Sequence, residues 1–157
     1  MNAGATVAII EGETILLTLR EDFEVWCMPG GAIDEGETIA DAARREVREE
    51  TGLEVELTRL VGIYSRVGWH ANNIFLFAAR VSGGVLTPDP HEVLEARFFP
   101  FDALPQAQDL IFGHEVRLRD AISGVTGCVR TERIDLPTVP TVSRAEWYAQ
   151  RLSLIHI

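Results

Sequence analysis

Residues 31–53 read G-A-I-D-E-G-E-T-I-A-D-A-A-R-R-E-V-R-E-E-T-G-L, and this stretch determines how the rest of the chain is interpreted. Thr38, followed three residues later by Asp41, is a capping-box pattern that marks the start of a helix. Gly52 stands where helices commonly end in a left-handed residue. Together these signals predict a helix from about Thr38 to Thr51.

Three glutamates of this helix share one side of it. At roughly 100° per residue, Glu46, Glu49 and Glu50 fall within one arc, with Ala42 and Ala43 in or beside that arc. Glutamate runs are usually solvated helix faces, but isolated carboxylates are costly to bury beside apolar residues. Because all-oxygen carboxylate sites suit Mg²⁺ or Mn²⁺, the pattern predicts a divalent-cation site.

The same residues resemble the signature of the Nudix hydrolases, G-x5-E-x7-R-E-U-x-E-E-x-G-U with U aliphatic, and every fixed position is filled. The resemblance implies an α/β fold, namely an α/β/α sandwich with a mixed β-sheet. It also implies that the three helix glutamates and the carbonyl of Gly31 hold Mg²⁺, or alternatively Mn²⁺. In this interpretation Glu37 and Gly52 are structural. We favour a role for Arg45 in holding Glu37 and the helix carboxylates over contact with substrate.

The resemblance continues outside the signature and covers about residues 5–122. Residues 25–31 look like the family's W-x-[LM]-P-G-G entry, residues 92–100 like its E-x-x-E-x-R-W-F strand, and residues 101–105 like its D-x-L-P turn. The first predicted elements are a hairpin of strands 6–10 and 15–20 and a polar loop over 20–28. Four more strands are predicted over 53–66, with a bend at Gly62, and over 73–81, 85–87 and 96–99, with a turn at Gly83-Gly84 before the third of them. A second helix is predicted over 114–122.

The length of 157 residues predicts a single domain, 1–157, with a core over about 5–122. Residues 124–157 form a C-terminal extension in which Ser143-Arg144-Ala145-Glu146 could start a short helix. This extension is rich in apolar residues, so we expect it to contribute to a homodimer.

Composition excludes several classes of function. The formal net charge of −10 argues against a general nucleic-acid-binding surface. No apolar run approaches a membrane span, and no secretory signal pattern is present. Cys27 and Cys128 are too few for a disulfide framework. We therefore expect a cytoplasmic protein, and the resemblance to the Nudix hydrolases implies a small-molecule nucleotide substrate.

The resemblance implies a reaction in which water attacks one phosphorus of a nucleoside diphosphate linked to another group. Metals held by the helix glutamates would neutralise charge and orient the water. The general base is left open between a glutamate of the signature (Glu46 or Glu49), Glu92 and Glu95. For substrate contact, Trp69 could stack on a base or simply pack, Tyr64 could line the pocket or the core, and Arg66 could contact phosphate. His91 and His114 read as ordinary polar residues.

Two further interpretations stay open. The chain could be a catalytically silent nucleotide-binding or regulatory module, although no signature glutamate is missing. It could also be an isopentenyl-diphosphate isomerase, which shares the fold and would use a cysteine such as Cys27. For a hydrolase, nucleoside triphosphates, including damaged ones, or nucleotide sugars are the preferred substrates.

Overall fold

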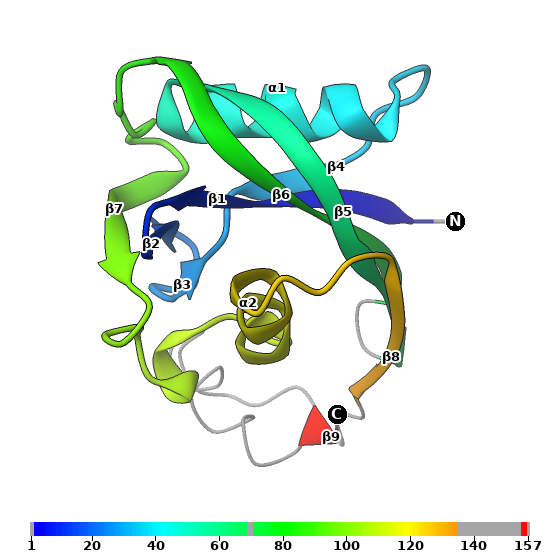
Figure 1. Cartoon of the computed structure of the whole chain (residues 1–157). Coiled ribbons are helices and arrows are strands. Elements are labelled where there is room, and N and C mark those ends of the chain that lie inside the picture. Colours follow the sequence, from blue (N-terminus) through cyan, green and yellow to red (C-terminus); the bar gives the residue numbers. More distant parts are fainter. Residues whose placement is uncertain (1, 69–70, 135–154, 157) are drawn as a thin grey trace.

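A twisted mixed sheet runs through the middle of the protein, and its two main helices lie on opposite faces of that sheet (Figure 1). The computed structural model describes residues 2–68, 71–134 and 155–156. The elements are β1 (Ala3–Glu11), β2 (Thr14–Arg20), β3 (Trp26–Cys27), β4 (Gly30–Ala32), α1 (Ile39–Thr51), β5 (Leu53–Gly68), β6 (Asn72–Gly84), β7 (Val93–Pro100), the 3₁₀ turn η1 (Ala107–Asp109), α2 (His114–Ile122), β8 (Cys128–Ile134) and β9 (Ile155–His156). This arrangement confirms the predicted α/β sandwich.

The sheet combines both kinds of strand pairing. Its strand order is β3-β2-β1-β6-β5-β8-β9, with β4 paired to β1 and β7 to β2. β1 runs parallel to β6, and β5 runs parallel to β8, whereas β5 and β6 form a long antiparallel pair. Gly62 lies at a register shift in β5, as its predicted bend requires.

Alternation along the strands gives the sheet two hydrophobic faces. Val7 and Ile9 of β1 belong to the cluster that contains Val47 of α1, whereas Ala8 belongs to the cluster that contains Leu118 of α2. Full burial of one such valine, leucine or isoleucine contributes roughly 1.5–3 kcal/mol. Both helices are thereby fixed to the same central strand.

The ends of α1 are set by local interactions. The Thr38 hydroxyl oxygen accepts a hydrogen bond from the Asp41 amide at 3.1 Å. Gly52 adopts a left-handed φ of 72°, and its amide donates to the Arg48 carbonyl. The predicted helix is therefore confirmed, and its contact with β4 brings the Glu46 carboxylate against Gly31.

The predicted turn at Gly83-Gly84 and the strand over 85–87 are wrong. Both glycines belong to β6 and pair with Glu54 and Leu53 of β5. A Cβ atom at Gly84 would collide with the Gly52 carbonyl oxygen. The glycine therefore serves a close approach between two chain segments rather than a turn.

The sheet also extends beyond the elements expected from the sequence. The loop predicted over residues 20–28 contains the short strand β3, and β8 continues the sheet past the expected core boundary at about residue 122. The proposed helix after Ser143 and most of the C-terminal extension lie outside the described residues. No helix in the described ranges has the length and apolar character needed to cross a bilayer.

Candidate active site

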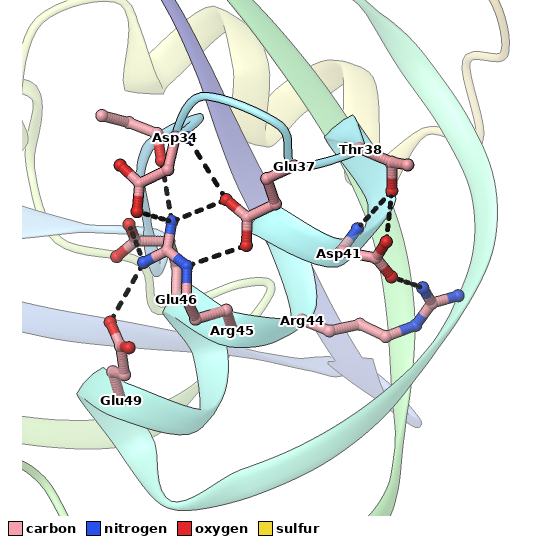
Figure 2. A network of polar contacts seen from close by, with 9 residues as sticks. Asp34, Glu37, Thr38, Asp41, Arg44, Arg45, Glu46 and Glu49 are labelled. Atoms are coloured by element: carbon pink, nitrogen blue, oxygen red, sulfur yellow. Dashed lines mark hydrogen bonds and ion pairs between the residues drawn. The ribbon is translucent and has the colours of Figure 1, made fainter.

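Arg45 is the centre of a network of carboxylates at the start of α1 (Figure 2). Its Nε and Nη2 donate to the two Glu37 oxygens at 2.9 and 3.0 Å. Its Nη1 donates to Glu46 at 2.8 Å and to Glu49 at 3.1 Å, and Nη2 also reaches the Ala32 carbonyl. The Glu37 contact is bidentate, which fixes the guanidinium in one orientation. Arg45 therefore ties α1 to the preceding loop.

Gly31 lies directly against the Glu46 carboxylate. A Cβ atom at position 31 would come within 2.5 Å of the Glu46 carboxyl carbon. The Glu46 side chain is only 12% exposed, so it has little room to move aside. Glycine is thus required here because the carboxylate occupies the space that a side chain would take.

Glu46, Glu50 and Glu92 line one pocket of about 390 Å³, which we call the acidic pocket. The pKa of Glu50 is raised to about 8, mainly by burial and to a lesser extent by the neighbouring Glu46 and Glu92, against the opposing hydrogen bond from the Gly30 amide at 3.1 Å. Burial likewise raises the pKa of Glu46, opposed by Arg45. These carboxylates therefore destabilise one another when all are ionised.

The charge of the acidic pocket fits a divalent cation. Arg20 lines the pocket, but its Nε and Nη2 already donate to Asp22 at 2.8 and 2.6 Å. The remaining carboxylates form an all-oxygen donor set of the kind that Mg²⁺ and Mn²⁺ prefer. Within the described ranges, however, no three His, Cys, Asp or Glu side chains are already gathered in a metal-binding cluster.

Glu49 differs from the expectation that all three helix glutamates face inward. Its side chain is 55% exposed and it does not line the acidic pocket. It instead accepts a hydrogen bond from Arg45, on the outer side of the network. Its place at the edge of the arc explains the difference, since the helix turns it away from the sheet.

The two candidate bases outside the helix occupy different surroundings. Glu92 lines the acidic pocket, just before β7. Glu95 does not line that pocket, and its carboxylate pairs with Arg97 at 3.3 Å. Of the two, only Glu92 shares a cavity with Glu46 and Glu50.

A second cavity of about 460 Å³, here called the inner pocket, adjoins the acidic pocket and shares Arg20, Gly30 and Gly31 with it. The inner pocket is also lined by Asn72, His114 and Arg117, none of which the sequence singled out as functional, and by Arg66. His114 is only 5% exposed, which corrects its interpretation as an ordinary polar residue. Its burial depends on the long-range packing of α2 against the sheet, for which the sequence carries no local signal.

The predicted substrate residues separate in the structure. Arg66 lines the inner pocket. Tyr64 is fully buried in the core cluster and its hydroxyl donates to Asp120 at 2.7 Å, so its assignment to the substrate pocket is corrected. Its side chain faces the hydrophobic core rather than solvent. Trp69 lies outside the described residues.

Cys27 is buried and lines the inner pocket. The pKa of its thiol is raised to about 12, mainly by burial and also by the charge of Glu50, while the hydrogen bond with the Thr18 hydroxyl opposes the shift. The thiol therefore stays protonated at neutral pH. This environment does not suit the proton-transfer role that the isomerase interpretation would assign to Cys27.

Comparison with known proteins gives one consistent family. The NUDIX domain model matches residues 1–120. An ADP-ribose pyrophosphatase from Methanocaldococcus jannaschii is 33% identical over 126 residues, which cover 75% of this chain and 72% of the relative. An 8-oxo-dGDP phosphatase from Homo sapiens is 35% identical over 115 residues, which cover 67% of this chain but only 35% of the relative.

The fold comparison agrees with the sequence comparison. The crystal structure of a NUDIX hydrolase from Nitrosomonas europaea superimposes with a TM-score of 0.76 at 22% identity. The match covers 84% of this chain and 78% of that chain. At this level of identity the likeness concerns the architecture of the sheet and helices.

Proposed function

This chain belongs to the Nudix family of hydrolases, and we propose that it is a Mg²⁺-dependent pyrophosphohydrolase that cleaves a nucleoside diphosphate linked to another group. The observation that carries the proposal is that the half-buried Glu46 and Glu50 line one pocket, where partial burial raises the pKa of both carboxyl groups. The inner pocket beside them supplies space for the remainder of the substrate.

Glu46, Glu50 and the Gly31 carbonyl would hold the cation, with Glu49 joining from the rim. When bound, the cation neutralises phosphate charge and activates water. Arg45 forms ion pairs with Glu37, Glu46 and Glu49 and so holds their carboxylates in place, which makes it a positioning residue in this proposal. The Gly30 amide orients Glu50 through its hydrogen bond.

Glu92 is the proposed general base, because it shares the acidic pocket with Glu46 and Glu50. A base must lie within hydrogen-bond reach of the water it deprotonates, directly or through one further water. Glu46 and Glu49 remain the competing candidates, while the Arg97 pairing makes Glu95 the weaker one.

For the substrate we propose nucleoside triphosphates, including oxidised ones, or nucleotide sugars. The human relative is named for a phosphatase activity on 8-oxo-dGDP, and the archaeal relative for cleavage of ADP-ribose. The alternative of a silent binding module would keep the inner pocket but lose hydrolysis. The complete set of signature glutamates favours the enzyme.

Glu50→Gln tests the proposed function. It removes a carboxylate from the cation site while keeping its size, so we expect hydrolysis to fall by at least about 100-fold. Phosphate release from a nucleotide panel with Mg²⁺ measures this. The matched control is Glu56→Gln, whose exposed carboxylate pairs with Arg80 on the strand surface.

The same pair of variants reports on folding. Because Glu50→Gln removes a buried charge, its melting temperature without metal should be no lower than that of the wild type. Mg²⁺ should raise the melting temperature of the wild type and of Glu56→Gln more than that of Glu50→Gln. Wild-type turnover in Glu50→Gln would contradict the assignment of the site.

We also propose that the chain forms a homodimer to which the C-terminal extension contributes. The argument is its apolar composition, which gives it surface to bury. Light scattering on the full chain measures the assembly, and a monomer would refute it.

A further inference from the structure

Three buried polar atoms at the inner pocket have no hydrogen-bond partner within the described ranges. They are Oδ1 of Asn72 and the two ring nitrogens of His114, although the Phe112 backbone lies close enough to the imidazole to interact with it. Both residues line the pocket, and His114 is 95% buried, since only 5% of it is exposed. Buried polar groups are normally hydrogen-bonded, and each exception needs an explanation. Because the three atoms are shielded from solvent, a ligand in the pocket would supply the missing partners once these side chains turn toward it.

The wall around these atoms carries excess positive charge. Arg66 and Arg117 also line the pocket, and both bind the buried Glu132 carboxylate, at 3.3 and 2.5 Å. Two guanidinium groups therefore share one carboxylate. Burial, together with the charge of Arg117, holds the pKa of His114 well below its usual value, so the imidazole is neutral and leaves the imbalance in place.

We propose that the inner pocket selects a nucleobase by its carbonyl edge, an oxo group beside a ring N–H, over the corresponding amino edge, with His114 as the specificity-determining residue. The proposal rests on the proposed function in taking the ligand to be a nucleotide. Hypoxanthine and uracil present such an edge, whereas adenine and cytosine present an amino group beside an unprotonated ring nitrogen.

The preference follows from donors, acceptors and charge. A neutral imidazole offers one donor and one acceptor, and the Asn72 amide offers both kinds, so these groups can satisfy a C=O and an N–H side by side. Guanidinium groups offer donors only. The positive potential of Arg66 and Arg117 therefore favours a carbonyl oxygen over an amino group at the same position. The register of β5 and β6 supports this arrangement, because it pairs Arg66 with Asn72.

Calorimetric binding of nucleoside monophosphates tests the selection without requiring catalysis. IMP and AMP share sugar and phosphate and differ in this edge of the base, as do UMP and CMP. We expect the wild type to bind IMP tighter than AMP, and UMP tighter than CMP, by at least about tenfold. Equal affinities, or tighter binding of AMP and CMP, would overturn the proposal.

Variants at position 114 test whether His114 determines the selection of the base. His114→Leu should reduce the preference to about twofold or less, and His114→Gln, which keeps a donor and an acceptor, should retain most of it. Asn72→Leu provides an independent loss of preference if His114→Leu fails to fold. The matched control is Asn73→Ala, because the Asn73 amide oxygen accepts from Ser65 and the residue does not line the pocket.

Failure of the proposed function would be visible separately. Phosphate release from ITP with Mg²⁺ reports on hydrolysis, whereas the ratio of dissociation constants for IMP and AMP reports on selection. Selective binding without hydrolysis would support the inference and refute the enzyme. Hydrolysis with unselective binding would support the proposed enzyme activity and refute the selection of the base.

Discussion

At the scale of single residues, the sequence predicts the identities at the site better than the reasons for them. Glu46 and Glu50 can be placed on the inner side of a helix from spacing alone. That Gly31 must lack a side chain because Glu46 occupies the space depends on how β4 lies against α1. The burial of His114 and the exposure of Glu49 depend on packing in the same way, so spacing does not reveal them.

Gly31→Ala should abolish most hydrolysis because the added methyl group would displace the Glu46 carboxylate. We expect a loss of at least about tenfold in kcat/KM, since small misplacements of catalytic groups are costly. Gly83→Ala is the matched control, because a Cβ atom there would meet only the Glu54 Cβ at 3.8 Å. Steady-state phosphate release measures both variants. Equal activity of the two would show that the Glu46 position does not matter.

At the scale of elements, the bounds of some elements are set by residues within them, whereas the position of others is set by partners distant in sequence. The bounds of α1 follow from Thr38 and Gly52, which act within the helix itself, so the sequence predicts them. β8 carries charged residues at positions 130, 132 and 133 and lacks an alternating apolar pattern, and its place is set by pairing with residues 62–68 of β5. Its buried Glu132 is tolerated only because α2 and β5 each provide an arginine. Sequence patterns do not reveal such distant partners.

Glu132→Gln should destabilise the protein by about 3–5 kcal/mol, because it leaves Arg66 and Arg117 buried without their shared counter-charge. Urea unfolding followed by circular dichroism measures the loss. In contrast, Glu54→Gln breaks a surface pair with Arg48 and should leave the unfolding midpoint unchanged. A small effect of Glu132→Gln would mean that water or another group compensates the two arginines.

At the scale of the whole molecule, two hydrophobic clusters share one sheet, and the buried polar side chains His114, Arg117, Asp120 and Glu132 belong to α2 and β8. The fold class and the mixed sheet follow from the signature and the strand pattern. The inner pocket does not, because β5, β6 and α2 assemble it from residues far apart in sequence. Its polar groups link the stability of the whole protein to pH.

His114 should make the protein less stable in mild acid. Its pKa lies well below the usual 6.5 in the folded state, because burial and Arg117 oppose protonation. The unfolded chain therefore binds the proton first as pH falls. The free energy of unfolding is therefore unaffected by His114 protonation above about pH 6.5. It decreases as pH falls below this value towards the folded pKa, with a slope approaching about 1.4 kcal/mol per pH unit.

The comparison of wild type with His114→Gln isolates this effect, because glutamine does not titrate. The difference in their free energies of unfolding, measured from pH 8 down to about pH 5, should shift against the wild type on the acidic side. A difference that stays constant with pH would show that His114 has the same pKa in the folded protein as in the unfolded chain.

The central position of β1 has a consequence for how the protein is made. This strand leaves the ribosome well before its parallel partner β6, which does not begin until Asn72. Until then, a strand of apolar residues has only β2 and β4 to pair with, and its remaining edge is open to other chains. Nascent protein should therefore depend on chaperones, and slowing translation before β6 should increase aggregation.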